Sequence, residues 1–186
     1  MSERSTVYTV GHGARSVDEL IGVLRAAGVD RIVDVRRYPG SRRHPQFGRD
    51  ALSASLAEAG IGYRWLGEPL GGRRRPASGP SRHPAWREPS FRAYAEHMET
   101  AEFQTALHQL EDEVERGERV ALLCAETLWW RCHRRLIADA LVAREYRVVH
   151  LLGRGQQQEH VQHPAARVDD EGRLIYDRGP RQGSLL

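Results

Sequence analysis

The sequence contains neither lysine nor asparagine, and each absence excludes a kind of chemistry. Without lysine the chain cannot form a Schiff base with a substrate or a pyridoxal cofactor, and it cannot carry a P-loop. Without asparagine it has no acceptor for N-glycosylation. All 28 basic residues are arginine, so any side-chain cation that binds a ligand is a guanidinium or a protonated histidine.

Cysteine is scarce and long apolar runs are missing. Two cysteines cannot form the disulfide framework of a small secreted protein, and no stretch approaches the roughly 20 apolar residues of a membrane helix. The N-terminus also lacks the apolar segment of a signal peptide. These absences predict a cytoplasmic protein with no membrane partner.

Length and composition predict one globular domain. The chain has 186 residues, of which 40% are hydrophobic and 28% charged, and a chain of this size buries about 70% of its unfolded surface. It therefore needs neither a disulfide nor a structural metal to fold. We expect a single domain over residues 1–186, with residues 178–186 as a disordered tail.

The basic residues are unevenly distributed. Residues 36–92 hold 12 arginines and four acids, a local charge of +8, whereas the rest of the chain has a charge of −5. A basic block of this kind indicates a surface that binds a small anionic ligand or nucleic acid. The alternative is a solvent-exposed face of an arginine-rich protein.

Apolar runs alternate with amphipathic segments, which is typical of α/β proteins. The apolar runs predict strands at 6–10, 31–35, 62–66, 120–124 and 147–152. The amphipathic segments predict helices at 17–27, 50–59, 91–98, 101–116 and 132–144, the first of them after a capping box of Ser16 and Glu19. A turn at 169–172 predicts a final hairpin between 166–168 and 174–176.

This order of elements predicts a single three-layer α/β domain. It would have a mostly parallel sheet, helices on both faces and a C-terminal hairpin. In such folds the ligand site lies beyond the carboxyl ends of the strands. The ends of three predicted strands and the start of the predicted helix at 132–144 carry polar residues that we expect to converge on one cleft there: His12, Asp34, Arg36, Glu126, Cys132, His133 and Arg134.

Six short motifs together resemble a known family. They are Thr9-Val10-Gly11-His12; Asp34-Val35-Arg36 with Pro39, Ser41 and Phe47; Gly60-Ile61-Gly62-Tyr63; Leu70-Gly71-Gly72; Cys124-Ala125-Glu126; and Cys132-His133-Arg134. The combination resembles the domain of unknown function 488 family from about residue 6 to residue 177. The resemblance implies a compact α/β fold in a bacterial or archaeal cytoplasmic protein, and it implies no particular activity.

One segment departs from the family pattern. Between Glu126 and Cys132 such sequences are usually polar and contain proline, whereas this chain has Thr-Leu-Trp-Trp-Arg. Trp129 and Trp130 could form a lid or a platform for stacking bases, or they could pack on a neighbouring element.

Asp34 and Glu126 are candidates for general acid and base catalysis. Two carboxylates facing one pocket can divide these roles when their environments separate their pKa values. An N-glycosidic or phosphoester bond in a nucleotide would suit such a pair beside a basic surface. The alternative is that Asp34 pairs with Arg36 or Arg134 and holds its loop.

The two cysteines allow three interpretations. Cys132 precedes a predicted helix, whose N-terminus favours a thiolate, so it is a candidate nucleophile. Cys124, Cys132, His133 and His12 could instead bind a metal, although their spacing matches no zinc signature. Structural cysteines are the third possibility, and we expect no cofactor.

The remaining candidates would bind the substrate. Guanidinium groups match phosphate geometry, which favours Arg36, Arg37 and Arg134 as anion ligands, assisted by His133 and Tyr63. Tyr63 and Trp65, with the arginines at 73–75, could also stack on and grip single-stranded nucleic acid. His12, in its Gly-His-Gly turn, could act as a general base, donate to a phosphate, or only cap the neighbouring helix.

These residues predict a hydrolase or transferase acting on a phosphate-bearing substrate such as a nucleotide or nucleic acid. His12, Asp34, Glu126 and Cys132 would be its catalytic residues. Two alternatives remain open: a non-catalytic nucleic-acid-binding module that uses the basic loops, and a thiol or metal protein.

Overall fold

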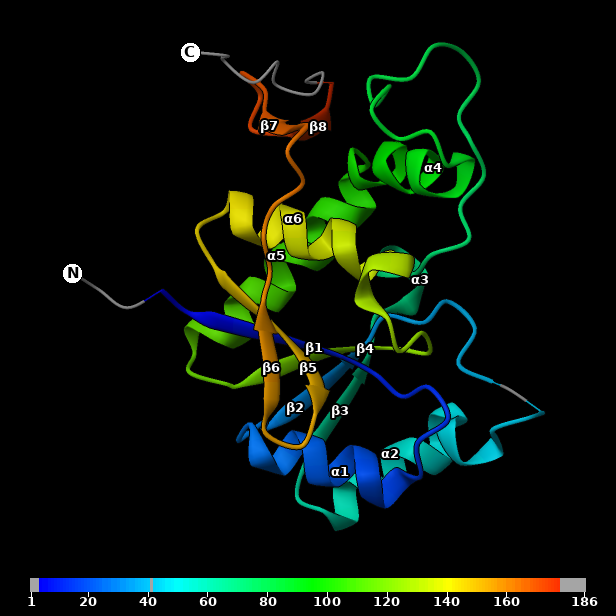
Figure 1. Ribbon diagram of the computed structural model, residues 1–186, viewed down its shortest axis with the longest axis vertical. Coiled ribbons are helices and arrows are strands. Elements are labelled where there is room, and N and C mark those ends of the chain that lie inside the picture. The colour runs from blue at the N-terminus through cyan, green and yellow to red at the C-terminus, as the bar shows by residue number, and fades with distance from the viewer. Residues whose placement is uncertain (1–3, 41, 178–186) are drawn as a thin grey trace, which may run out of the picture.

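The computed structural model describes residues 4–40 and 42–177, so the expected tail at 178–186 lies outside the described residues. The strands are β1 (Thr6–Gly11), β2 (Arg31–Asp34), β3 (Gly62–Trp65), β4 (Val120–Cys124), β5 (Arg147–Gly153), β6 (Gln156–Glu159), β7 (Ala166–Val168) and β8 (Leu174–Tyr176). The α-helices are α1 (Val17–Ala26), α2 (Arg49–Glu58), α3 (Gly67–Leu70), α4 (Pro89–Met98), α5 (Ala101–Glu115) and α6 (Arg134–Ala143). Short 3-10 helices cover Pro45–Phe47 and Trp129–Arg131. Figure 1 shows their arrangement.

The main sheet has six strands in the order β3-β2-β4-β1-β5-β6. Neighbours pair in parallel except β6, which returns antiparallel to β5. Gly11 lies opposite Cys124, and Asp34 lies opposite Leu123, so β1, β2 and β4 end at one edge. The prediction of a mostly parallel α/β sheet is confirmed.

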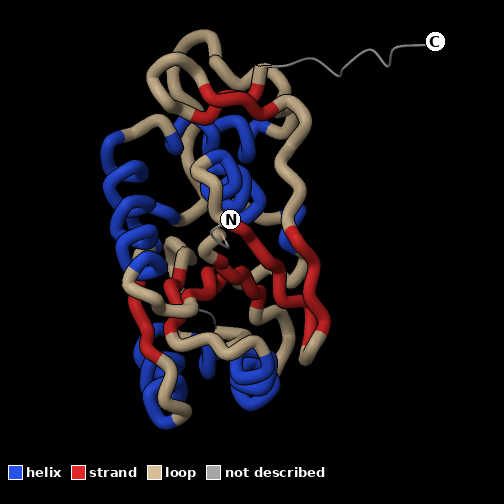
Figure 2. The backbone as a smooth tube through the Cα atoms, turned by 90° about the vertical axis from the view of Figure 1, so that its left-hand side faces the viewer, coloured by secondary structure: helices blue, strands red, loops and turns tan. Residues whose placement is uncertain are grey.

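Helices cover both faces of this sheet (Figures 1 and 2). Successive strand residues point to opposite faces, so Val7 packs in the core under α4, α5 and α6, while its neighbour Tyr8 packs in the core under α1 and α2. The two cores make the three layers that the sequence predicts.

Helix α1 begins where the capping box predicts. The Ser16 hydroxyl accepts a hydrogen bond from the Glu19 amide at 3.1 Å, and the Glu19 carboxylate accepts one from the Ser16 amide at 2.7 Å. The two bonds satisfy amides that no helical carbonyl can reach. The helix therefore has a defined start, which fixes the length of the turn after His12.

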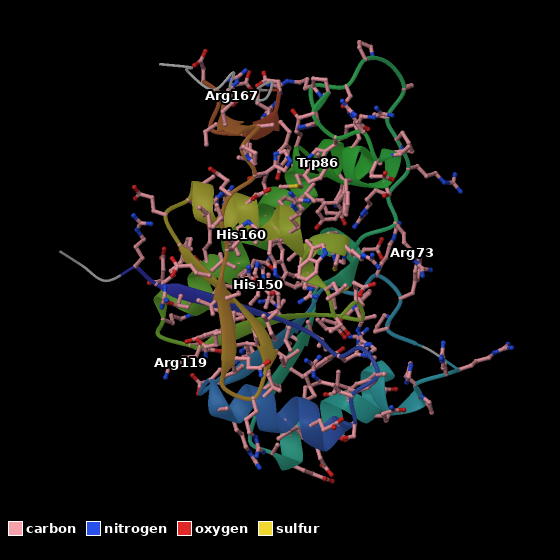
Figure 3. The ribbon with its side chains drawn as sticks, in the orientation of Figure 1. Arg73, Trp86, Arg119, His150, His160 and Arg167 are labelled. Atoms are coloured by element: carbon pink, nitrogen blue, oxygen red, sulfur yellow. The ribbon has the colours of Figure 1, made fainter. Side chains whose placement is uncertain are left out.

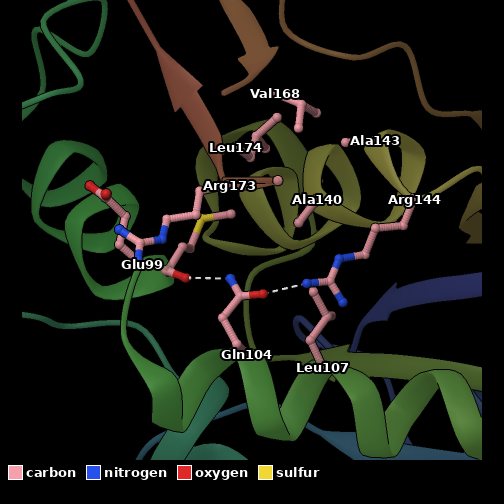
Figure 4. A pocket seen from close by; sticks show the side chains of 11 residues that line it. Glu99, Gln104, Leu107, Ala140, Ala143, Arg144, Val168, Arg173 and Leu174 are labelled. Carbon is pink, nitrogen blue, oxygen red and sulfur yellow. Dashed lines mark hydrogen bonds between the residues drawn. The ribbon is translucent and has the colours of Figure 1, made fainter. Parts of the chain in front are cut away.

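The C-terminal hairpin of β7 and β8 is also confirmed, with Val168 opposite Leu174. It lies above α5 and α6 and leaves only a small cavity of about 40 Å³ between them (Figure 4). Gln104 crosses the base of this cavity, donating to the Met98 carbonyl at 2.7 Å and accepting from Arg144. The hairpin therefore closes one face of the domain away from the predicted site.

No helix among the described residues is long and apolar enough to cross a membrane.

Candidate anion-binding pocket

A pocket of about 640 Å³ opens at the carboxyl ends of β1, β2 and β4. Six of the predicted site residues line it, namely His12, Arg36, Arg37, Glu126, Cys132 and His133. The other three, Asp34, Arg134 and Tyr63, do not line it. The pocket lies where an open α/β sheet places its ligand site.

Asp34 is fully buried and bonded to Arg36. One carboxylate oxygen accepts from the Arg36 amide at 3.0 Å and from Nε at 2.9 Å, and the other accepts from Nη2 at 2.5 Å. Tyr63 donates its hydroxyl to the same oxygen at 2.7 Å. The structure therefore shows the pairing that was the alternative to a catalytic Asp34, and it does not bring Asp34 and Glu126 into one pocket.

The second predicted arginine clamp, Arg134, is also buried, with 1% of its surface exposed. Its guanidinium donates to the backbone carbonyls of Glu126 and Thr127 and to the Thr9 hydroxyl. Arg134 therefore holds the loop that carries Glu126 against β1. This positioning role differs from the predicted contact with an anion.

His12 is packed into the pocket wall. Its ring stacks on Phe47 with the centroids 4.2 Å apart. Nδ1 lies 2.9 Å from the Gly13 carbonyl oxygen, so it donates there, and Nε2 accepts from Arg36 at 3.3 Å. Burial lowers the pKa of His12 to about 4. The ring is therefore neutral at pH 7, with its proton on Nδ1.

The base of the pocket contains both cysteines. Cys124 ends β4, and Cys132 and His133 directly precede α6; the two sulfurs and a His133 nitrogen all lie within 4.8 Å of one another. Burial alone would raise the pKa of Cys132, but hydrogen bonding with Cys124 and the charge of Arg134 lower it to about 6. Among the described residues this is the one group of three His, Cys, Asp or Glu side chains close enough to hold a metal ion.

Positive charge predominates in the lining. Arg36, Arg37, Arg73 and Arg131 line the pocket, and Glu126 is its single acid. Within the part of the chain that the structure describes, neither the Arg73 nor the Arg131 guanidinium makes an ion pair or hydrogen bond, and Arg37 Nε is buried without a partner. Arg73 and Arg131 are therefore available to a ligand in a way that Arg36 is not, and Arg37 is partly available because only one of its nitrogens has a partner among the described residues.

Arg73 also has an unusual backbone. Its φ is +58°, a conformation that residues other than glycine rarely adopt. Its carbonyl accepts from Arg37 at 3.1 Å, which ties the two cationic segments together. Figure 3 shows Arg73 on the connection that follows α3. Backbone strain of this kind is concentrated at functional sites.

Three other arginines of the basic block bond within the protein. Arg64 bonds Glu113, Arg82 bonds both Glu99 and Asp169, and Arg74 donates to backbone carbonyls. The anionic-ligand surface over residues 36–92 stays a prediction, and three of its arginines, Arg36, Arg37 and Arg73, line the pocket.

The aromatic residues divide into packed and exposed groups. Trp129 stacks on His150 at 4.2 Å and donates to Gln158 at 3.1 Å, so it packs on a neighbour. Trp65 donates to the Arg36 carbonyl at 2.9 Å, so its indole N–H also bonds within the protein. Tyr38 is 64% exposed on the pocket lining, and Trp130 is 42% exposed beside Arg131. Among the described tryptophan, tyrosine and phenylalanine residues, these two are the exposed ones.

Two glycines explain how tightly the pocket is built. A Cβ on Gly11 would lie 1.9 Å from the Glu126 carbonyl oxygen, and one on Gly72 would lie 2.9 Å from His133 Nδ1. Close backbone approach therefore requires glycine at both positions. These glycines belong to the motifs that carry the family resemblance.

Sequence reasoning missed several lining residues, notably Tyr38, Arg131 and Tyr94. Tyr38 follows the Arg36-Arg37 pair and Arg131 precedes Cys132, so proximity to predicted site residues was the available signal. Tyr94 comes from α4, and no local motif distinguishes it from a core tyrosine. Its placement depends on how α4 packs over the sheet.

The fold and the pocket define an α/β protein with a basic, cysteine-containing cleft at the carboxyl edge of its sheet. The chain belongs to the family described as Domain of unknown function DUF488, whose model matches residues 16–141. This confirms the predicted family, over a shorter stretch than the expected residues 6–177. No curated protein and no solved structure matched the chain.

Proposed function

We propose that this protein is a hydrolase or transferase whose pocket binds a phosphate-bearing substrate. The observation that carries the proposal is the pocket itself. Among the described residues its lining has one acid, Glu126, and two arginines, Arg73 and Arg131, whose guanidinium groups make no ion pair or hydrogen bond; Arg37 lies beside them. Arginine is well suited to bind phosphate because its planar fork can donate two parallel hydrogen bonds.

Glu126 is the group best placed to move a proton. It is exposed on the lining, and one of its oxygens accepts from the Leu128 amide at 3.2 Å, which leaves the other oxygen available to a substrate. His12 is neutral, but both of its nitrogens are occupied, by Gly13 and Arg36. The proposal therefore assigns proton transfer to Glu126, and it assigns Asp34 to holding Arg36.

Tyr38 supports a nucleotide as the substrate class. Its exposed ring lies on the pocket lining beside Arg37, whose guanidinium carbon is 5.6 Å from the ring centroid. Stacking of a base on an aromatic ring contributes about 1–3 kcal/mol. A nucleotide would then place its base against Tyr38 and its phosphate among the arginines.

Calorimetric titration of the full chain with inorganic phosphate, nucleoside phosphates and a short single-stranded oligonucleotide tests the proposal. Arg73→Gln and Arg131→Gln should each weaken the best ligand about tenfold, because a hydrogen bond to a charged group contributes about 1.5–3 kcal/mol. Arg116→Gln is the matched control, because Arg116 caps α5 outside the pocket.

Two results would contradict the proposal. One is that no phosphate-bearing ligand binds even at low salt. The other is that the pocket variants bind as tightly as the control. Binding of the oligonucleotide without turnover of any tested substrate would instead favour the non-catalytic nucleic-acid module.

A further inference from the structure

Three side chains at the base of the pocket have a geometry that suits a metal ion. Cys132 Sγ lies 3.6 Å from His133 Nδ1, and all three ligand atoms, including Cys124 Sγ, lie within 4.8 Å of one another. Zinc bonds of about 2.3 Å to sulfur and 2.0–2.1 Å to nitrogen, in a tetrahedron, separate ligand atoms by roughly 3.5–3.8 Å. The side chains therefore need to move little to share one ion.

His133 is oriented for this role by the backbone. Its Nε2 lies 3.0 Å from the Val35 carbonyl oxygen. A carbonyl can only accept, so Nε2 carries the proton and the lone pair of Nδ1 faces the two sulfurs. Metal-binding histidines usually donate their second ring N–H to a carbonyl or carboxylate in this way.

Neighbouring backbone supports the same cluster. The Arg134 amide lies 3.5 Å from Cys132 Sγ and donates to it. Gly72 packs so closely against the histidine that an added Cβ would lie 2.9 Å from Nδ1. The positions of the sulfur and the imidazole are therefore both fixed from outside the cluster.

We propose that Cys124, Cys132 and His133 bind one zinc ion whose fourth coordination position opens into the pocket. All three residues line the pocket, so an ion between them faces its interior. Two thiolates and one imidazole form a soft donor set that selects zinc over magnesium or calcium. Three protein ligands with one open position are characteristic of catalytic rather than structural zinc.

The open position would accept a water molecule or an oxygen of an anionic substrate. Two thiolates would also neutralise the charge of the ion, so zinc would add no net charge to a pocket already rich in arginine. This proposal does not depend on phosphate binding, because the three ligands are protein side chains. The two proposals can therefore fail separately.

Titration of the full chain with Co²⁺ tests the site. The chain is first reduced and freed of bound metal with a chelator, and the titration is done in a buffer without phosphate. Co²⁺ should bind with one ion per chain and give the strong near-ultraviolet absorption of thiolate-to-cobalt charge transfer, and zinc should displace it. Cys124→Ser and Cys132→Ser should each remove about half of this absorption. His133→Gln should keep the absorption at saturation while weakening binding at least about tenfold.

Two further variants, at positions that are not ligands, separate loss of the metal site from loss of the fold. Gly72→Ala keeps all three ligand residues but should weaken cobalt binding, because the new Cβ would lie 2.9 Å from His133 Nδ1 and would displace the ring. His108→Gln removes a histidine that is 65% exposed on α5 and should change nothing. An absent charge-transfer band in the folded, reduced protein would overturn the proposal, as would cysteine variants that bind cobalt as tightly as the unsubstituted chain. Either result would leave the cysteines as thiols without a metal.

Discussion

Asp34 and Arg36 form a bidentate ion pair at the end of β2, with the carboxylate fully buried and Nη2 2.5 Å from Oδ2. The remaining guanidinium nitrogen donates to the Phe47 carbonyl at 2.8 Å and to His12. The pair thus links β2, the 3-10 helix at Pro45–Phe47 and the turn after β1. It builds one wall of the pocket and commits the Arg36 guanidinium to groups of the protein itself.

Asp34→Asn should destabilise the protein by about 3 kcal/mol, because it leaves the Arg36 charge buried without its partner. Urea unfolding at pH 7 measures the loss. Glu159→Gln is the control, since its pair with Arg147 is exposed on β5 and β6 and should contribute at most about 1 kcal/mol. Equal small losses in both variants would show that the buried pair does not hold the wall.

Stability should rise with pH between pH 5 and 6.5. Burial lowers the pKa of His12 to about 4 and that of His150 to about 2. Both histidines are therefore neutral in the folded chain but bind protons below about pH 6.5 in the unfolded chain. The unfolded state binds more protons in this window, so each histidine contributes a slope of up to about 1.4 kcal/mol per pH unit.

Urea unfolding at half-unit pH steps measures this slope. Most carboxylates already carry their charge above pH 5, so they contribute little to the slope in this window. His12→Gln and His150→Gln should each reduce the slope. Burial also lowers the pKa values of His83, His97 and His163, so these three histidines should supply part of the remaining slope. An unchanged slope in both variants would show that groups other than His12 and His150 cause the pH dependence of stability.

Gly11→Ala should destabilise the protein by at least about 1–3 kcal/mol, the usual cost of overpacking. The added Cβ would lie 1.9 Å from the Glu126 carbonyl oxygen, and backbone cannot yield as a side chain can. Gly40→Ala is the matched control, because a Cβ there meets nothing within 4 Å. Thermal unfolding of the two variants should separate them clearly, and similar melting temperatures would contradict the close approach of β1 to this loop.

Glu126→Gln should tighten phosphate binding roughly threefold, because it removes the charge of the one carboxylate that the described residues place in the pocket lining. The glutamine can still accept from the Leu128 amide, so the loop should keep its shape. Turnover of any identified substrate should fall sharply, since glutamine cannot exchange a proton. Glu58→Gln, an exposed acid at the end of α2 outside the pocket, should change neither quantity. Weaker anion binding in Glu126→Gln would contradict the proposed role.

Most of the fold was predictable because its strands are apolar runs bounded by polar turns. β6 was missed for the opposite reason. Its four residues, Gln-Gln-Gln-Glu, are all exposed and show no alternation. It pairs with β5 through backbone hydrogen bonds after a turn at Gly155, whose φ is +71°. A polar edge strand of this kind has no hydrophobic signal in the sequence.

The sequence predicted where the site lies, but it predicted only some of the residues that line it. The strand-end rule brought His12, Glu126 and Cys132 to one pocket, because parallel strands end at one edge. It could not tell that Asp34 would turn back to Arg36, or that Arg134 would turn toward backbone carbonyls. Those directions depend on the local turn after each strand, which residue spacing does not determine.

The closeness of Cys124, Cys132 and His133 was also hidden in the sequence. Their spacing matches no zinc signature. They meet because a 3-10 turn at Trp129–Arg131 folds the residues between Cys124 and Cys132 back toward β4. The parallel pairing of β4 between β1 and β2 then sets Cys124 beside Val35, whose carbonyl orients His133. Only the three-dimensional arrangement shows that the two motifs meet.

The proposed anion site can be tested most directly by soaking crystals in tungstate, a phosphate-like oxyanion that scatters anomalously. We predict an anomalous peak inside the pocket, in contact with Arg37, Arg73 or Arg131, and its loss in the Arg73→Gln, Arg131→Gln double variant. Peaks confined to peripheral arginines such as Arg119 and Arg167 (Figure 3), with none in the pocket, would contradict the proposal that this cleft binds phosphate.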